Sequence, residues 1–174
     1  MSQSLTSFAD LLGSARKSAL HLEMRDVYAV DNETERFQAW KDGHRLDPED
    51  RNSWWRPWLD LVQEVTSSGV AVRRARIVSE PASDYIRYEH SFTFTNIAGG
   101  EEVRWLPRRL ASDLALPGND FWIFDGRIVQ FNIFDGDGRW VHTDQNEEPA
   151  VARFCAEAFE AVWGRAVPHE KYAV

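Results

Sequence analysis

The chain has 174 residues, which is the length of one ordinary domain, and its net charge of −8 argues against direct nucleic-acid binding because it repels phosphate backbones. A single cysteine, Cys155, excludes an internal disulfide and a zinc site built from several cysteines. No apolar run approaches the roughly 18 residues of a membrane span, and the N-terminus lacks signal-peptide features, so we expect a cytoplasmic protein with no membrane partner.

The N-terminal half of the chain contains five predicted elements. Apolar side chains at helical spacing predict a helix over residues 7–18, and alternating apolar and polar side chains predict a strand with one solvated face over 19–30. A short helix with an acidic start is expected from 31 to 40. A longer helix follows over 53–68, and the β-branched run 70–78 is typical of the parallel strand of an α/β unit.

The C-terminal half alternates in the same way. Helical spacing predicts a helix over residues 84–92, and a second parallel strand is expected over 102–106. Residues 119–131 contain an Asp-Gly pair between aromatic arms, which predicts a β-hairpin. A last short strand over 139–143 and a final helix over 151–163 complete the chain.

These elements predict one α/β domain spanning residues 1–174. The expected architecture is a mixed, mainly parallel sheet with helices on both faces, followed by a C-terminal β-hairpin and helix. No linker, internal repeat or low-complexity segment divides the chain.

Arginines inside predicted strands are the most unusual feature of the middle of the chain. Inner strands of parallel sheets are usually apolar, so charges within them need partners. The arginines in and after the two strands are Arg73, Arg74, Arg76, Arg104, Arg108 and Arg109. The candidate acidic partners are Glu80, Asp84, Asp120 and Asp125. The simpler interpretation is an edge strand whose arginines are solvated, with one structural ion pair.

Polar residues also follow both of these strands. Ligands of open α/β sheets collect beyond the carboxyl ends of the strands. The residues at that position are Ser79, Glu80, Ser83, Asp84 and Arg87 after one strand, and Arg108 and Arg109 after the other. They are therefore candidates for contact with a ligand.

A cluster of tryptophans precedes these strands. Trp54, Trp55 and Trp58 would cover more than half the circumference of a helix, with Arg56 among them. Packing within the chain is the simpler interpretation. An exposed Trp–Arg patch would instead be a hot spot for a ligand or a partner protein.

Other sites of chemistry receive little support. Cys155 lies on the apolar stripe of the last helix, which favours core packing. The five histidines lack the spacing of metal ligands, and phosphate-binding glycine loops are absent. The acidic residues Asp135, Asp137 and Asp144 lack the pattern of a calcium loop, so a hairpin turn is the better interpretation. We therefore expect no metal, no cofactor and no catalytic residue of a known kind.

Several segments resemble a bacterial family of unknown function that is often encoded beside small helix-turn-helix regulators. The segments that carry this resemblance are residues 8–12, 22–28, 58–62, 69–85, 104–108 and 120–125. The resemblance covers nearly the whole chain but implies no established activity. It implies a regulatory role and a protein partner, for example a helix-turn-helix regulator.

The order of elements is also similar to one half of the phospholipase D fold. That superfamily uses a His-x-Lys-x4-Asp run, in which the histidine is the nucleophile and the lysine holds the phosphate. The corresponding positions here are Gly118, Asp120 and Asp125. Glycine offers no nucleophile and aspartate repels phosphate, so phosphodiesterase activity is not expected. Because that fold usually pairs two halves, a homodimer is expected as well.

Two functions remain open on these grounds. The first is a non-enzymatic regulatory or interaction module that binds a partner protein or a small effector. The alternative is an enzyme that uses Asp84, Asp120 or Asp125 as a general base and Arg73 or Arg104 to hold an anionic small molecule. Convergence of Asp120, Asp125 and Arg73 in one pocket would favour the enzyme.

Overall fold

The protein folds around a single seven-stranded sheet. A computed structural model describes residues 6–29 and 31–174, except for the side chains of residues 31 and 32. The strands are β1 (Ser18–Glu23), β2 (Ala71–Val78), β3 (Glu102–Pro107), β4 (Phe121–Phe124), β5 (Ile128–Phe134), β6 (Trp140–Asn146) and β7 (Val167–Pro168). They lie in the order β6–β5–β4–β1–β2–β3–β7.

The sheet is mixed, as predicted, but less parallel than predicted. Only β1, β2 and β3 run parallel to one another, and the four remaining pairings are antiparallel. Short connections explain two of these antiparallel pairings, β4–β5 and β5–β6. The Asp125-Gly126 turn, with φ of 53° and 67°, can join only antiparallel neighbours.

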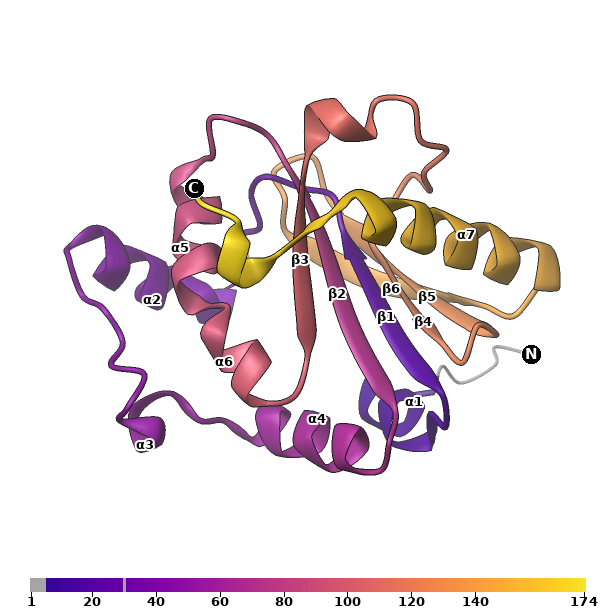
Figure 1. Ribbon diagram of the computed structural model, residues 1–174, viewed down its shortest axis with the longest axis horizontal. Coiled ribbons are helices and arrows are strands. Elements are labelled where there is room, and N and C mark those ends of the chain that lie inside the picture. The colour runs from indigo at the N-terminus through magenta and orange to yellow at the C-terminus, as the bar shows by residue number, and fades with distance from the viewer. Residues whose placement is uncertain (1–5, 30) are drawn as a thin grey trace.

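Helices cover both faces of this sheet. They are α1 (Phe8–Ser14), α2 (Asp31–Lys41), α3 (Arg51–Trp54), α4 (Pro57–Ser67), α5 (Asp84–Phe92), α6 (Phe94–Ala98) and α7 (Pro149–Arg165), with short 3₁₀ turns at Arg108–Ala111 and His169–Lys171. Figure 1 shows α7 crossing one face of the sheet, with α4 and α1 below the sheet in this view and α5 and α6 at its left. None of the described helices is long and apolar enough to cross a membrane.

The alternation of side chains along β1 shows how the two faces differ. Leu20 and Leu22 point to the α7 face, where they share an apolar core with Phe159 of α7. His21 and Glu23 point to the opposite face and are also buried, with 7% and 8% of their surface exposed. The prediction that this face of the strand is solvated was therefore wrong.

The observed elements differ from the predicted ones mainly at their ends. The first helix ends at Ser14 and β1 ends at Glu23, both earlier than predicted, and Val30 lies outside the described residues. The predicted helix over 53–68 is two helices, because Arg56 is extended (φ −139°, ψ 157°) immediately before Pro57. The three tryptophans of the cluster therefore do not share one helix.

Candidate functional site

The candidate site lies on the sheet face opposite α7. The parallel register places His21 beside Arg74 and Glu23 beside Arg76. Next to these strands, Trp122 of β4 pairs with His21, and Asp120 lies just before β4. Because alternate residues of neighbouring strands face the same side, these polar side chains form a charged layer across the middle of the sheet.

Two buried arginines hold this layer together. Arg74 donates to Glu23 (Nη1 to Oε1, 2.6 Å) and to Glu101 (Nε to Oε2, 2.8 Å). Arg76 donates to the other oxygen of Glu23 (Nε to Oε2, 2.5 Å) and more weakly to Oε1 of Glu89 at 3.4 Å. Burial alone would raise the pKa of Glu23, but the two guanidinium groups hold it well below the usual value.

A cavity of about 280 Å³ lies on this layer. Strands β1, β2 and β5 and helices α2, α4, α5 and α6 all contribute to its wall. The charged and histidine side chains that line it are His21, Glu23, Glu33, Arg56, Arg74, Arg76, Glu89 and Asp120. The aromatic side chains that line it are Tyr28, Trp58, Tyr85, Tyr88, Phe92 and Phe134.

Two carboxyl groups in the cavity wall have raised pKa values. Burial, with a further contribution from Glu23, raises the pKa of Glu89 to about 8 although Arg76 opposes the shift. Burial also raises the pKa of Asp120 to about 6, although Asp120 accepts hydrogen bonds from the Tyr28 hydroxyl and the Met24 amide. Both groups therefore change charge near neutral pH.

Some buried polar atoms of this wall have no partner within the described chain. They are Oε2 of Glu89 and both ring nitrogens of His21, whose Nδ1 lies 3.6 Å from Oε1 of Glu23. The imidazole stacks on Trp122 with 4.2 Å between ring centroids. Burial and the neighbouring Arg74 lower the pKa of His21, so the ring is neutral at pH 7.

Asp120, Asp125 and Arg73 do not converge. Asp125 lies at the opposite end of β4 from Asp120, where its carboxylate accepts the backbone N–H groups of residues 16–18 at 2.7–3.1 Å. Arg73 lies beside Trp163 of α7, on the other face of the sheet. The geometry that the predicted enzyme requires is therefore absent from these three residues.

Several of the residues predicted to contact a ligand at the carboxyl ends of the strands instead form hydrogen bonds within the chain. The Asp26 carboxylate accepts Ser79 N and Oγ, each at 2.7 Å, and Arg108 Nη2 at 3.3 Å. Ser83 caps α5 and donates to the Asp26 carbonyl oxygen. This region borders a hollow of about 310 Å³, which also touches Glu80, Arg109 and Ser112.

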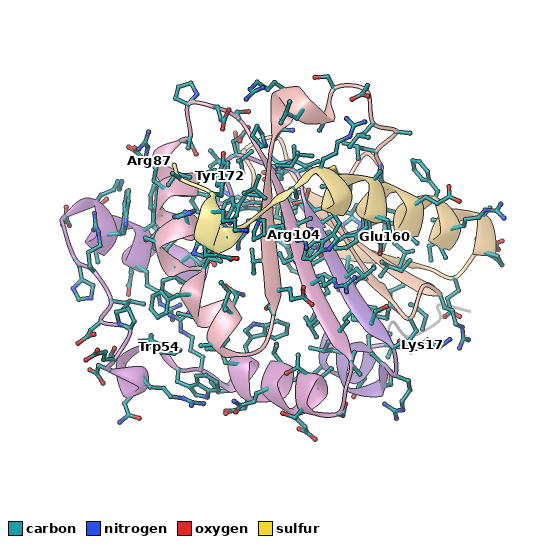
Figure 2. The ribbon with its side chains drawn as sticks, viewed as in Figure 1. Lys17, Trp54, Arg87, Arg104, Glu160 and Tyr172 are labelled. Atoms are coloured by element: carbon teal, nitrogen blue, oxygen red, sulfur yellow. The ribbon has the colours of Figure 1, made fainter. Side chains whose placement is uncertain are left out.

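The remaining predicted residues lie apart from the cavity or at its edge. Asp84 is exposed in the first turn of α5. Arg87 lies on the same helix, and its label is near that of Tyr172 in the view of Figure 2. Figure 2 also shows Arg104 beside α7, where its guanidinium lies 4.3 Å over Trp163.

The tryptophan cluster is divided between several roles. Trp54 is buried on α3 and donates to the Asp47 carbonyl oxygen, and Trp55 donates to the Asp60 carboxylate. Trp58 and Arg56 line the cavity. Packing within the chain therefore accounts for Trp54, whereas Arg56 and Trp58 belong to the site.

The acidic partners of the buried arginines Arg74 and Arg76 were predicted wrongly, whereas the expected Glu80 does pair with an arginine, Arg109, at 3.5 Å. Glu23, Glu89 and Glu101 bind Arg74 and Arg76, whereas none of the four acids expected from the sequence does so. One signal in the sequence could have found Glu23. His21 and Glu23 are two residues apart in one strand, and Arg74 and Arg76 are two residues apart in the next. In parallel neighbouring strands, both pairs can therefore point to the same face of the sheet.

The arrangement contains carboxyl groups that can bind and release protons near neutral pH. Where the phospholipase D resemblance places a nucleophile and a phosphate-binding lysine, the chain has the exposed Gly118 and the buried carboxyl group of Asp120. Within the described part of the chain, no three His, Cys, Asp or Glu side chains gather as metal ligands.

Comparisons with solved structures concern the fold. The chain is similar to NucT from Helicobacter pylori (10% identity, TM-score 0.51), with 92% of this chain and 87% of NucT covered. It also matches Nuc, a phospholipase D family member from Salmonella typhimurium (11% identity, TM-score 0.49, coverage 92% and 86%). A third match is TrmBL2, an archaeal chromatin protein (14% identity, TM-score 0.46, coverage 91% and 47%). The likeness to NucT shows a shared fold, and the predicted class of an α/β domain with a mixed sheet is confirmed. An identity of 10% carries no information on chemistry.

Sequence comparison gives the family. No curated protein matches the chain. The family described as "Domain of unknown function (DUF6879)" matches residues 6–174. Because this match covers nearly every residue, the chain belongs to the DUF6879 family.

Proposed function

We propose that the protein is a non-enzymatic binding module that holds a small effector in the cavity on the charged layer. The observation that carries this proposal is the convergence of partnerless buried atoms, Oε2 of Glu89 and the His21 nitrogens, on one cavity wall. Buried polar groups normally have partners, and a ligand would supply them. The volume of about 280 Å³ suits a small molecule.

The electrostatics of the cavity support binding rather than phosphodiester cleavage. Every guanidinium nitrogen of Arg74 and Arg76 already donates to a carboxylate or to Thr93, which reduces the positive charge that could hold a phosphate. A phosphodiester in the cavity would also meet the carboxylates of Glu33 and Asp120. Like charges within a poorly solvated cavity oppose such a substrate.

The proposal is tested by blocking the cavity. Asn132, which lines the cavity from β5, is replaced by Trp, and the exposed Gln63 on α4 is replaced by Trp as the control. Native mass spectrometry and thermal shifts with a diverse small-molecule collection should find compounds that bind wild type and Gln63→Trp but not Asn132→Trp. If no compound shows this pattern, the cavity is not an effector site.

An acid–base enzyme is the second candidate, and the raised pKa values of Glu89 and Asp120 favour it. The two functions differ in the fate of the bound molecule. Under the binding proposal, a bound compound is recovered unchanged after prolonged incubation, and bis(p-nitrophenyl) phosphate is hydrolysed no faster than in buffer. Turnover that Asp120→Asn abolishes would instead establish the enzyme.

A protein partner, for example a helix-turn-helix regulator, is part of the same proposal. Its support is the outermost strand β6, on which Trp140 and Val141 are 55% and 51% exposed. Exposed aromatic residues on an unpaired strand edge are typical of binding surfaces. Affinity capture from the native host should recover a partner with wild type and lose the same partner with Trp140→Ser.

A further inference from the structure

We propose that the effector is a small organic cation, with an amine, amidinium or guanidinium head on a flat apolar body. This inference rests on the proposed effector cavity and names the class of ligand that it takes. Three independent properties of the wall point to such a ligand: its charge, its aromatic surface and one unpartnered carboxylate oxygen.

The carboxyl groups that line the cavity outnumber its positively charged side chains. Arg74 and Arg76 are neutralised within the layer, chiefly by Glu23 and by Glu101 behind it. The remaining acids of the wall are Glu33, Glu89 and Asp120, and the remaining cation is Arg56. Arg25, near Asp120, and Arg36, near Arg56 and Tyr88, add positive charges outside the wall. A bound cation would favour ionisation of Glu89, whose carboxyl group is largely protonated in the free protein at neutral pH, and the two opposite charges would attract. An anion would oppose that ionisation.

The aromatic side chains supply surfaces that suit a cation. Two of these rings already form cation–π contacts with arginines. The guanidinium carbon of Arg56 lies 4.7 Å from the centroid of the Phe92 ring, and that of Arg25 lies 5.1 Å from the centroid of the Phe134 ring. Tyr28 and Tyr85 line the same cavity, and their hydroxyl groups donate hydrogen bonds to Asp120 and Glu33, respectively. Aromatic faces combined with carboxylates are the usual surroundings of bound organic cations.

Glu89 provides the anchor for the head group. It lies on α5, where Oε1 accepts a hydrogen bond from Arg76 and Oε2 is buried without a hydrogen-bond partner. An amidinium or ammonium group would donate to Oε2 and form a charge-assisted hydrogen bond. Because the pKa of Glu89 is about 8 in the free protein, the arriving cation also displaces a proton at neutral pH.

The test uses three probes of nearly the same shape: benzamidine, which is a cation, benzamide, which is neutral, and benzoate, which is an anion. Isothermal titration calorimetry near neutral pH, in two buffers of different ionisation enthalpy, measures affinity and proton release together. We expect benzamidine to bind with release of protons, benzamide to bind at least about ten-fold more weakly, and benzoate not to compete.

Two variants locate the interaction. Glu89→Gln keeps the shape and hydrogen bonding of the protonated side chain, so it should fold, yet it should weaken benzamidine at least about ten-fold and abolish proton release. Asp84→Asn removes an exposed acid from the same helix and should change neither quantity.

Several results would overturn the inference. They are a failure of benzamidine to bind, equal affinity for benzamide, competition by benzoate, or full affinity in Glu89→Gln. Neutral or anionic compounds that bind wild type but not Asn132→Trp would leave the effector cavity in place while removing the cationic ligand. Absence of every cavity-dependent compound would remove both.

Discussion

The two faces of the central sheet are built on different principles. The α7 face is a continuous apolar core, in which Phe121, Leu22 and Phe159 are fully buried. The opposite face places a layer of ion pairs between two smaller apolar clusters and leaves a cavity above it. Buried ion pairs add little net stability compared with apolar packing, so we infer that the second face is maintained for binding.

The largest expected effect is a difference in stability loss between two neighbouring arginines, Arg74 of the charged layer and Arg73 on the α7 face. Arg74→Met leaves Glu101 without its main partner and Glu23 with Arg76 as its remaining arginine, and it should lower the free energy of unfolding by about 3–5 kcal/mol. Arg73→Met loses a contact at 3.6 Å with the exposed Glu102 and the contact of its guanidinium with the Trp163 ring, so it should cost only about 1 kcal/mol. Unfolding curves in guanidinium chloride measure both losses of stability. Equal losses would contradict the proposed difference between the two faces.

The next effect concerns how stability depends on pH. The folded pKa of Glu89, about 8, exceeds its ordinary value of 4.5, so folding loses stability as pH rises between these values. Glu23 has a lowered pKa, so its contribution is lost only as pH falls below its ordinary range. Unfolding curves at several pH values should show that Glu89→Gln removes a decline on the order of 2 kcal/mol between about pH 5 and pH 8.

The control for this experiment is Asp84→Asn, which should keep the wild-type decline because Asp84 is exposed. A wild-type stability that is flat between about pH 5 and pH 8 would contradict the buried, raised carboxyl group.

The smallest expected effect tests whether Asp125 is structural. Asp125→Ala removes the acceptor of three backbone N–H groups and should cost about 1–2 kcal/mol of stability. Asp125→Asn keeps an acceptor and tolerates the positive φ of 53°, so it should cost less. Both variants should bind benzamidine as wild type does, and a loss of binding would place Asp125 in the site.

Local patterns in the sequence predict much of the fold. The strand predicted over 70–78 is observed at Ala71–Val78, and the helix predicted over 84–92 has the bounds Asp84–Phe92. Both depend on spacing and on clear turn residues. The two-residue strand β7 and the break at Arg56 depend on tertiary pairing and on one proline, which periodicity does not register.

The candidate site was only partly predictable. The arginines of β2 stand out because charges within an inner strand need partners. The identity of those partners depends on the register of β1 against β2 and on which face of α5 meets the sheet. Glu23 and Glu89 therefore resemble ordinary surface acids in the sequence, although Glu23 is buried and Glu89 is largely buried, both against Arg76.

The most direct test of the account is the pKa of the Glu89 carboxyl group, measured by carbon-13 NMR with and without benzamidine. We expect a value near 8 in the free protein and a fall toward the ordinary range when the cation binds. A Glu89 that titrates near its ordinary value of 4.5 in the free protein, or that does not respond to benzamidine, would contradict it.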